Sequence, residues 1–293
     1  MEKVEFFLLG LKGFNVLNSF LKDFRPDKIN KVVIARDTNI DNDYYDEIRS
    51  LCDSHNVTWM DRRDYQSDNN DCFQFLVGWR WMVNPHEKLI VFHDSILPKY
   101  RGFSPLVNML LNKEPFIGVT AIYASERYDE GEIILQDRKE VIYPITIFEA
   151  INMVSEIYYK LIKQISIVIF DGKIPSSIPQ EHSKATYSLW RDNDDYRIDW
   201  SNSSDEIVHF HRCVGYPFGG AKCKIKGKIY DIVSLEEFPD VAIESRDRNI
   251  GKVIFFDDSK PVVICGKGLV KINLIKDPAG SDLDKISFRT KFE

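Results

Sequence analysis

Residues 89–105 read LIVFHDSILPKYRGFSP, and this stretch decides the fold that we predict for the chain. Its apolar beginning indicates a buried strand, and a turn-rich segment at residues 97–102 precedes a helix predicted from about Pro105. Strands that alternate with helices form a parallel α/β sheet. Such sheets bind ligands outside the carboxyl ends of their strands, so His93, at the end of the apolar run, has the position of a site residue.

Strand and helix patterns alternate on both sides of this stretch. Apolar runs predict further strands at residues 4–9, 31–35, 57–60, 72–77 and 118–123, and helical patterns occupy residues 15–24, 41–55 and 146–170. The predicted fold class is therefore α/β, a Rossmann-like, mostly parallel sheet with flanking helices. Short β-rich pieces at residues 221–233, 252–256 and 261–275 predict a small second domain, built as a β-barrel or sandwich.

The composition argues against several classes of protein. The chain has 293 residues, of which 44% are hydrophobic and 29% charged, as in a folded protein of two domains. Its formal charge of -6 offers no overall attraction for a phosphate backbone, so we expect no nucleic-acid partner. The five cysteines include no CxxC pair, which favours a reducing compartment. The first apolar run contains Glu5 and is too short for a membrane span, so we expect a cytoplasmic protein without a membrane partner.

The quoted stretch contains one part of a larger set of motifs. Residues 93–102 follow the pattern H-x-S-x-L-P-x-x-x-G, and G-V-T at residues 118–120 and D-x-G at residues 129–131 come later. With these motifs the chain resembles the folate-dependent formyltransferases, which include methionyl-tRNA formyltransferase and the sugar N-formyltransferases. The resemblance implies transfer of a formyl group from N10-formyltetrahydrofolate to a primary amine, with His93 and Asp129 as catalytic residues.

The chemistry of such a transfer suits these two residue types. An amine that attacks a formyl carbonyl must be neutral, must lose a proton, and passes through a tetrahedral state that carries an oxyanion. The imidazole of His93 can take the proton, and a carboxylate beside it makes the ring a better base. Asp129 follows the next predicted strand, so we expect it to meet His93, while N10 of the folate receives a proton as it leaves.

The resemblance also assigns the folate-binding residues and the domains. Residues 77–82 match the strand and loop that wall the pteridine pocket of the family, although Trp79 and Trp81 suit a packed core equally well. The expected folate-binding residues are Trp79, Arg80, Trp81, Met82, Leu97, Tyr100, Gly102 and Gly131. Residues 185–191, 198–200 and 216–221 resemble the segment that opens the C-terminal domain of the family. We therefore expect a catalytic domain over residues 1–184 and an OB-like domain over residues 185–293.

The resemblance leaves the acceptor amine open. The motif is closest to that of the bacterial sugar N-formyltransferases, which favours a nucleotide-linked amino sugar for surface polysaccharides, such as a pseudaminic-acid precursor. The residues expected to hold it are Lys12, Phe103, Tyr187, Trp190 and Arg191. Initiator tRNA is the alternative acceptor, but it would require a basic surface. Relatives of this kind often pair through the second domain, so we also expect a homodimer.

One position departs from the family pattern. The family carries an Asn two residues before the catalytic His, where its amide donates to the formyl oxygen, but this chain has Val91. Loss of one such donor costs about 10²-fold or more in rate. The candidate replacements are protonated His93, a backbone N–H, Asn84 and Asn108. A non-catalytic folate or nucleotide-sugar sensor is the alternative function that this departure suggests.

Two weaker signals concern phosphate and metal binding. Residues 10–13, Gly-Leu-Lys-Gly, follow the first predicted strand as in a phosphate loop, but they are more typical of a plain turn, from which Lys12 could reach a diphosphate. His209 and His211 lie near Cys213 in a predicted helix, where residues two apart point to different faces. We therefore expect no metal site.

Overall fold

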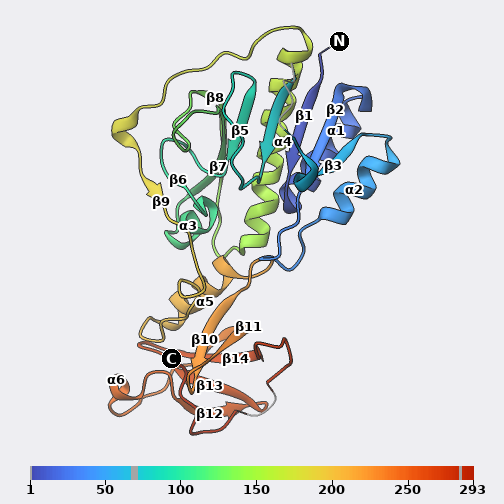
Figure 1. Cartoon of the computed structure of the whole chain (residues 1–293). Coiled ribbons are helices and arrows are strands. Elements are labelled where there is room, and N and C mark those ends of the chain that lie inside the picture. Colours follow the sequence, from blue (N-terminus) through green and yellow to red (C-terminus); the bar gives the residue numbers. More distant parts are fainter. Residues whose placement is uncertain (1, 67–71, 284–285) are drawn as a thin grey trace. The chain divides into compact units, whose positions relative to one another are not determined.

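The apolar runs of the sequence form one large sheet in the computed structural model, which describes residues 2–66, 72–283 and 286–293 (Figure 1). From edge to edge, its strands are β3 (Trp59–Asp61), β2 (Ile29–Ile34), β1 (Val4–Leu8), β4 (Phe73–Val77), β5 (Leu89–His93), β7 (Phe116–Tyr123) and β8 (Ile133–Glu140). The strands from β3 to β5 run parallel to one another. The prediction of a mostly parallel α/β sheet is confirmed, but β7 runs antiparallel to both β5 and β8.

Long helices cover one face of this sheet. The helices of the region are α1 (Gly10–Asp23), α2 (Tyr45–Ser54), α3 (Pro105–Leu111) and α4 (Ile147–Phe170). Phe6 of β1 contacts Phe20 of α1, and Phe92 of β5 contacts Tyr158 of α4, so both helices pack on the face that carries Phe6 and Phe92. Because the sheet is buried on both of its faces, the parallel strands are almost continuously apolar.

The other face of the sheet carries the site. Phe7, Val33, Leu76 and Leu89 form a buried cluster on it, and loop side chains such as Tyr65 and Trp79 pack against that cluster in place of a helix. Side chains alternate along a strand, so Val91 and His93 share the face of Leu89. Val91 packs against the same cluster, and the position that departs from the family pattern therefore lies on the face that carries His93.

The starts of the first two helices were predicted less accurately than the strands. The segment at residues 10–13 was expected to be a turn, but it forms the first turn of α1. Gly13 allows this first turn to lie close to β1, because a Cβ at residue 13 would lie only 2.9 Å from the Cβ of Leu8. Helix α2 begins at Tyr45, four residues later than the predicted start at residue 41.

The chain forms two compact units, residues 1–143 with 148–190 and residues 144–147 with 191–293. The second unit has a five-stranded antiparallel sheet, which confirms the predicted C-terminal β domain. Its elements are α5 (Ser204–Val214), β10 (Ala221–Ile225), β11 (Lys228–Phe238), α6 (Arg246–Asn249), β12 (Val253–Asp257), β13 (Lys260–Ile264) and β14 (Leu269–Lys276). Helix α5 begins with a capping box between Ser203 and Glu206. No helix in the described part of the chain has both the length and the apolar character of a membrane span.

Candidate active site

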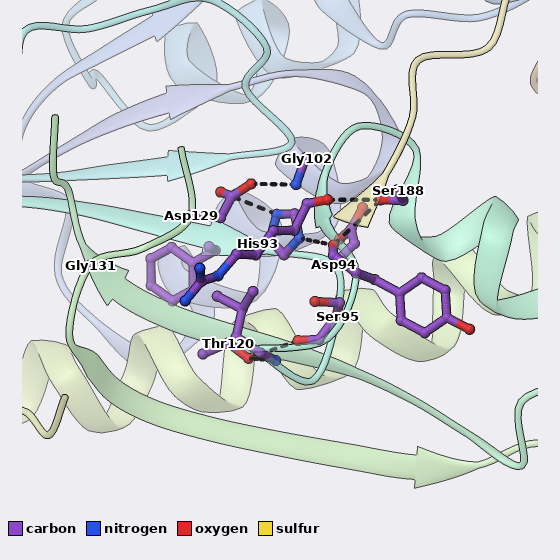
Figure 2. A network of polar contacts seen from close by, with 12 residues as sticks. His93, Asp94, Ser95, Gly102, Thr120, Asp129, Gly131 and Ser188 are labelled. Atoms are coloured by element: carbon purple, nitrogen blue, oxygen red, sulfur yellow. Dashed lines mark hydrogen bonds and ion pairs between the residues drawn. The ribbon is translucent and has the colours of Figure 1, made fainter. Parts of the chain in front are cut away.

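His93 is the last residue of β5 and lies between two oxygen acceptors. Its side chain is 8% exposed, its Nε2 is 2.7 Å from the carbonyl oxygen of Tyr100, and its Nδ1 is 3.4 Å from Oδ1 of Asp129 (Figure 2). A neutral imidazole can donate to only one of these oxygens, whereas a protonated ring can donate to both. The surroundings of His93 can therefore accommodate the ring after it has taken up a proton.

Asp129 reaches His93 from the loop between β7 and β8. Because β7 is antiparallel to β5, the end of β7 at Tyr123 lies opposite Ile90, near the start of β5. The two residues therefore do not come from strand ends at the same edge, as the sequence suggested. The loop returns along the sheet, and Oδ2 of Asp129 accepts a hydrogen bond of 2.8 Å from the backbone N–H of Gly102. The pair predicted from the motifs is thus brought together by a different route.

The polar residues of the motif hold the loop that follows His93. Ser95 Oγ donates to the carbonyl oxygen of Lys99, and Thr120 Oγ1 donates to that of Ser95, both at 2.7 Å. Gln136 donates to the carbonyl oxygen of Leu97 at 2.9 Å. Leu97 itself is buried, at 3% exposure. These contacts give the motif a structural purpose, since they fix the loop that contributes the Tyr100 carbonyl and the Gly102 amide.

The two glycines expected to bind folate are required by close backbone contacts. Gly102 has a φ of +95°, and a Cβ there would lie 2.6 Å from the carbonyl oxygen of Ser188. A Cβ at Gly131 would lie 1.7 Å from the carbonyl oxygen of Tyr123. Any side chain at either position would displace the backbone around Asp129, whatever further contact these glycines make with a ligand.

Lys12, which was expected to reach a diphosphate, is held by a carboxylate next to His93. Its ammonium group forms an ion pair with Asp94, the residue after His93. Tyr158 donates to Oδ1 of Asp94 at 2.6 Å, and burial raises the pKa of Tyr158 well above its usual value. Because Asp94 compensates the charge of Lys12, a bound phosphate would have to compete with this carboxylate.

The predicted folate-binding residues after β4 form a partly buried wall. The ring of Trp79 contacts those of Phe7 and Trp81 edge-on, with centroids 5.3 and 5.0 Å apart. Arg80 pairs with Asp37 at 2.7 Å, and Met82 is 66% exposed. The Nε1 of Trp79 is buried and has no hydrogen-bond partner among the described residues. A pteridine carries carbonyl and ring-nitrogen acceptors, so this buried donor suits a folate.

Tyr100 takes part through its backbone. Its phenol donates to Glu114 at 2.7 Å and accepts from Asn112 at 3.0 Å, on the side of α3, while its carbonyl oxygen faces His93.

The two asparagines considered as replacements for the family Asn are not placed beside His93 by any recorded contact. Asn84 is exposed, and the amide of Asn108 donates to the carbonyl oxygen of Ser104 at 2.9 Å.

Exposed aromatic rings gather beside the loops of the catalytic pair. The ring centroid of Phe103 lies 5.3 Å from that of Trp190 and 6.3 Å from that of Tyr128, and all three rings are more than 40% exposed. We call Phe103, Tyr128 and Trp190 the aromatic cluster. Arg80 approaches the ring of Trp190 at 6.0 Å, and Tyr187 lies beside Arg101. The sequence indicated Phe103, Tyr187 and Trp190 but missed Tyr128, because a tyrosine in a polar loop carries no pattern of its own.

The remaining candidates lie in the second unit. Arg191 directly follows Trp190, the last residue of the first unit, and belongs to the second unit. His209 lies 3.6 Å from the sulfur of Cys213, whereas His211 lies 3.2 Å from the carbonyl oxygen of Val233, and burial lowers the pKa of His211. The described residues contain no group of three or more side chains placed to hold a metal ion.

Both units match known domains. Residues 73–164 match the formyl transferase family, and residues 191–292 match the formyl transferase C-terminal domain. The chain belongs to the formyl transferase family. It is an N-formyltransferase, as its motifs indicated, and the expected co-substrate, N10-formyltetrahydrofolate, is confirmed at the level of the family.

Individual relatives include enzymes with different acceptors. The methionyl-tRNA formyltransferase of Porphyromonas gingivalis is 25% identical over 228 residues, which span 75% of this chain and 69% of the relative. That of Halothermothrix orenii is 30% identical over 198 residues, which span 67% and 62%.

Two solved structures share the fold at 18% identity. The N-formyltransferase of Helicobacter canadensis, in complex with folinic acid and dTDP-3-aminofucose, has a TM-score of 0.65 over 93% of this chain and 99% of its own. A 4-N formyltransferase of Francisella tularensis has a TM-score of 0.55 over 75% and 91%. At this identity, they establish the fold and leave the acceptor of the chain open.

The position of Val91 leads to a prediction. Val91→Asn places an amide on the catalytic face two residues before His93, at a cost of about 1–3 kcal/mol of stability if the amide finds no partner. We expect the variant to fold and to keep at least the kcat of the parent, because the amide restores the family's oxyanion donor. Steady-state kinetics and a thermal melt measure both effects. An inactive but folded variant would show that the pocket is shaped around valine.

Proposed function

We propose that the enzyme transfers the formyl group of N10-formyltetrahydrofolate to the primary amine of a nucleotide-linked amino sugar. The observation that carries this proposal is the aromatic cluster beside the catalytic pair. Phe103 directly follows Gly102, whose amide binds Asp129, and Tyr128 directly precedes Asp129. Exposed rings that share one patch suit stacking with a nucleoside base. The guanidinium of Arg80, which is paired with Asp37, lies 6.0 Å from the ring of Trp190.

The chemical steps follow from the geometry of the pair. Bound N10-formyltetrahydrofolate supplies the formyl carbon, and its N10 gains a proton in place of the formyl group. His93 accepts the proton that the attacking amine loses as its nitrogen bonds to the formyl carbon. Asp129 and the Tyr100 carbonyl stabilise the protonated ring, which also offers positive charge near the developing oxyanion. His93 then returns the proton to N10 as the bond between N10 and the formyl carbon breaks.

Initiator tRNA is the second candidate acceptor. The methionyl-tRNA formyltransferases among the relatives favour it. The formal charge of -6 counts against it, because contacts with a phosphate backbone require a basic surface. The non-catalytic sensor considered for Val91 is not a candidate, because the chain is an N-formyltransferase.

A mass-spectrometric screen separates these candidates. The purified protein is incubated with N10-formyltetrahydrofolate and a panel of UDP- and dTDP-linked amino sugars, with initiator methionyl-tRNA in a parallel reaction. We expect at least one amino sugar to gain a formyl group in place of hydrogen and the tRNA to remain unchanged. Formylation of the tRNA alone would replace the proposal. Folate binding without any formylated product would rule out the amino sugars of the panel as acceptors.

The aromatic cluster provides a sharper prediction. Trp190→Ala removes one ring of the proposed stacking site, and base stacking on an aromatic ring is worth about 1–3 kcal/mol. We expect the KM for the nucleotide sugar to rise about 10-fold or more, which corresponds to ~1.4 kcal/mol, with the KM for the folate unchanged. Ile174→Ala is the matched control, because Ile174 is 78% exposed and follows α4 away from the cluster. Equal KM values for both variants would remove the cluster from the substrate site.

A further inference from the structure

The chain returns to the catalytic loops after α4 ends. Ile178 pairs with Ile133 at the start of β8, and a short strand, β9 (Tyr187–Ser188), pairs in parallel with β6 (Arg101–Gly102). Ser188 also donates to the carbonyl oxygen of Arg101 at 3.2 Å. Residues 178–188, which we call the return segment, therefore border both loops that position the catalytic pair. The return segment lies outside residues 73–164, the part matched to the N-terminal family domain.

Gln180 of the return segment uses both ends of its amide. Its Nε2 donates to the backbone carbonyl oxygens of Asp129 and Gly131, each at 2.7 Å. Its Oε1 accepts from Nη2 of Arg101 at 2.7 Å and from Nε of Arg101 at 3.2 Å. Gln180 is only 6% exposed. One buried side chain thus ties the Asp129 loop to the residue that precedes Gly102.

The backbone of Asp129 also benefits from such a support. Its φ is +55°, in the left-handed region, which residues other than glycine adopt rarely, although Asp does so more readily than most. The preceding residues of the loop, Glu126, Arg127 and Tyr128, are exposed. One hydrogen bond from Gln180 holds the carbonyl group of Asp129 itself, and the other holds that of Gly131, two residues later in the same loop.

The far end of the Gln180 amide is also fixed. Arg101 is 1% exposed and pairs with Oε1 of Glu130 at 3.2 Å, and its Nη2 lies 3.1 Å from Nδ1 of His182. This buried guanidinium requires acceptors, which Glu130 and Gln180 provide. The orientation of the Gln180 amide is thereby set, with its oxygen toward Arg101 and its nitrogen toward the Asp129 loop.

We propose that Gln180 is a positioning residue that holds the carboxylate of Asp129 against His93. The inference rests on the proposed catalytic role of the pair. It makes the return segment, which connects α4 to the second unit, a part of the catalytic apparatus. A misplacement of a catalytic group by about 1 Å can lower a rate ~10²-fold. Two hydrogen bonds remote from the substrate are therefore sufficient to affect catalysis.

Gln180→Glu is the decisive variant. A glutamate keeps the oxygen that Arg101 requires but offers no N–H group, and its carboxylate faces two carbonyl oxygens. We expect kcat to fall about 10- to 100-fold, with the KM values for folate and acceptor within about 3-fold. Glu181→Gln is the matched control, because Glu181 is exposed and, among the described residues, its side chain is paired with its neighbours Ser183 and Lys184. We expect the control to keep the parental kcat.

A second readout requires no acceptor. The ring nitrogens of His93 are followed by NMR in 15N-histidine-labelled protein without substrates, with His93→Ala used to assign the signal. We expect Gln180→Glu to change the His93 ring signals across pH in the same direction as Asp129→Asn, and Glu181→Gln to leave them unchanged. If this result is obtained while no acceptor is formylated, the positioning role stands and the proposed function fails.

Two results would overturn the inference. The first is a folded Gln180→Glu protein with parental kcat and parental His93 signals. The second is a lower Tm with unchanged His93 signals, which would make Gln180 a residue of general stability. If Gln180→Glu does not fold, Gln180→Met, which keeps the length of the side chain without a charge, is measured in the same way.

Discussion

Turnover falls by about 10³-fold or more in His93→Ala, while the affinity for folate stays within a few-fold. The loss is large because a single imidazole handles both proton transfers, and acid–base catalysis contributes about 10²–10⁴-fold. The side chain is 8% exposed and lies between two acceptors, so alanine removes the proton carrier together with its contacts to Asp129 and the Tyr100 carbonyl oxygen. Single-turnover formyl transfer and equilibrium folate binding measure the two quantities separately.

The control for this variant is His55→Ala, which removes an exposed imidazole at the end of α2. We expect His55→Ala to match the parent in both assays. Retained turnover in a folded His93→Ala protein would contradict the catalytic role of His93. A loss of folate affinity equal to the loss of turnover would instead make His93 a binding residue.

Asp129→Asn has the second large effect. The amide keeps an oxygen for the N–H of Gly102 but loses the charge that faces Nδ1 of His93. We expect kcat to fall about 10²-fold or more and the pH–rate profile to change, because protonated His93 no longer has a charged partner. Discontinuous formyl-transfer assays between pH 5 and pH 9 measure both the kcat and the pH–rate profile.

Asp137→Asn is the matched control for Asp129→Asn. Asp137 lies on β8 and pairs with Lys160 of α4 at 2.8 Å, so its change to asparagine removes a comparable charge without touching His93. The hydrogen bond from Lys160 holds the pKa of Asp137 below its usual value, so Asp137 is charged in the parent throughout the assay range and its change to asparagine removes that charge at every pH. A profile for Asp129→Asn that coincides with that of Asp137→Asn would make Asp129 a structural residue.

The sequence predicted the catalytic pair because its evidence is local. The motifs at residues 93–102, 118–120 and 129–131 are each read within a few positions, and together they carry the resemblance that assigned His93 and Asp129. The parallel strands were also visible, since burial on both faces leaves an uninterrupted apolar run. Strand β8 was missed because its alternating polar residues, with only one face covered, resemble a loop.

Only the tertiary structure decided how the pair is assembled. The antiparallel direction of β7 sends the Asp129 loop back along the sheet, and Gln180 holds it from 51 residues farther along the chain. The aromatic cluster likewise joins Phe103 with Trp190, which are distant in sequence. The sequence by itself determined the fold class and the family, because these follow from local patterns of burial and from short motifs, and it proposed His93 and Asp129 as the pair. The support of Asp129 and the shape of the acceptor site depend on hydrogen bonds and ring contacts between distant segments, which leave no local pattern in a single sequence.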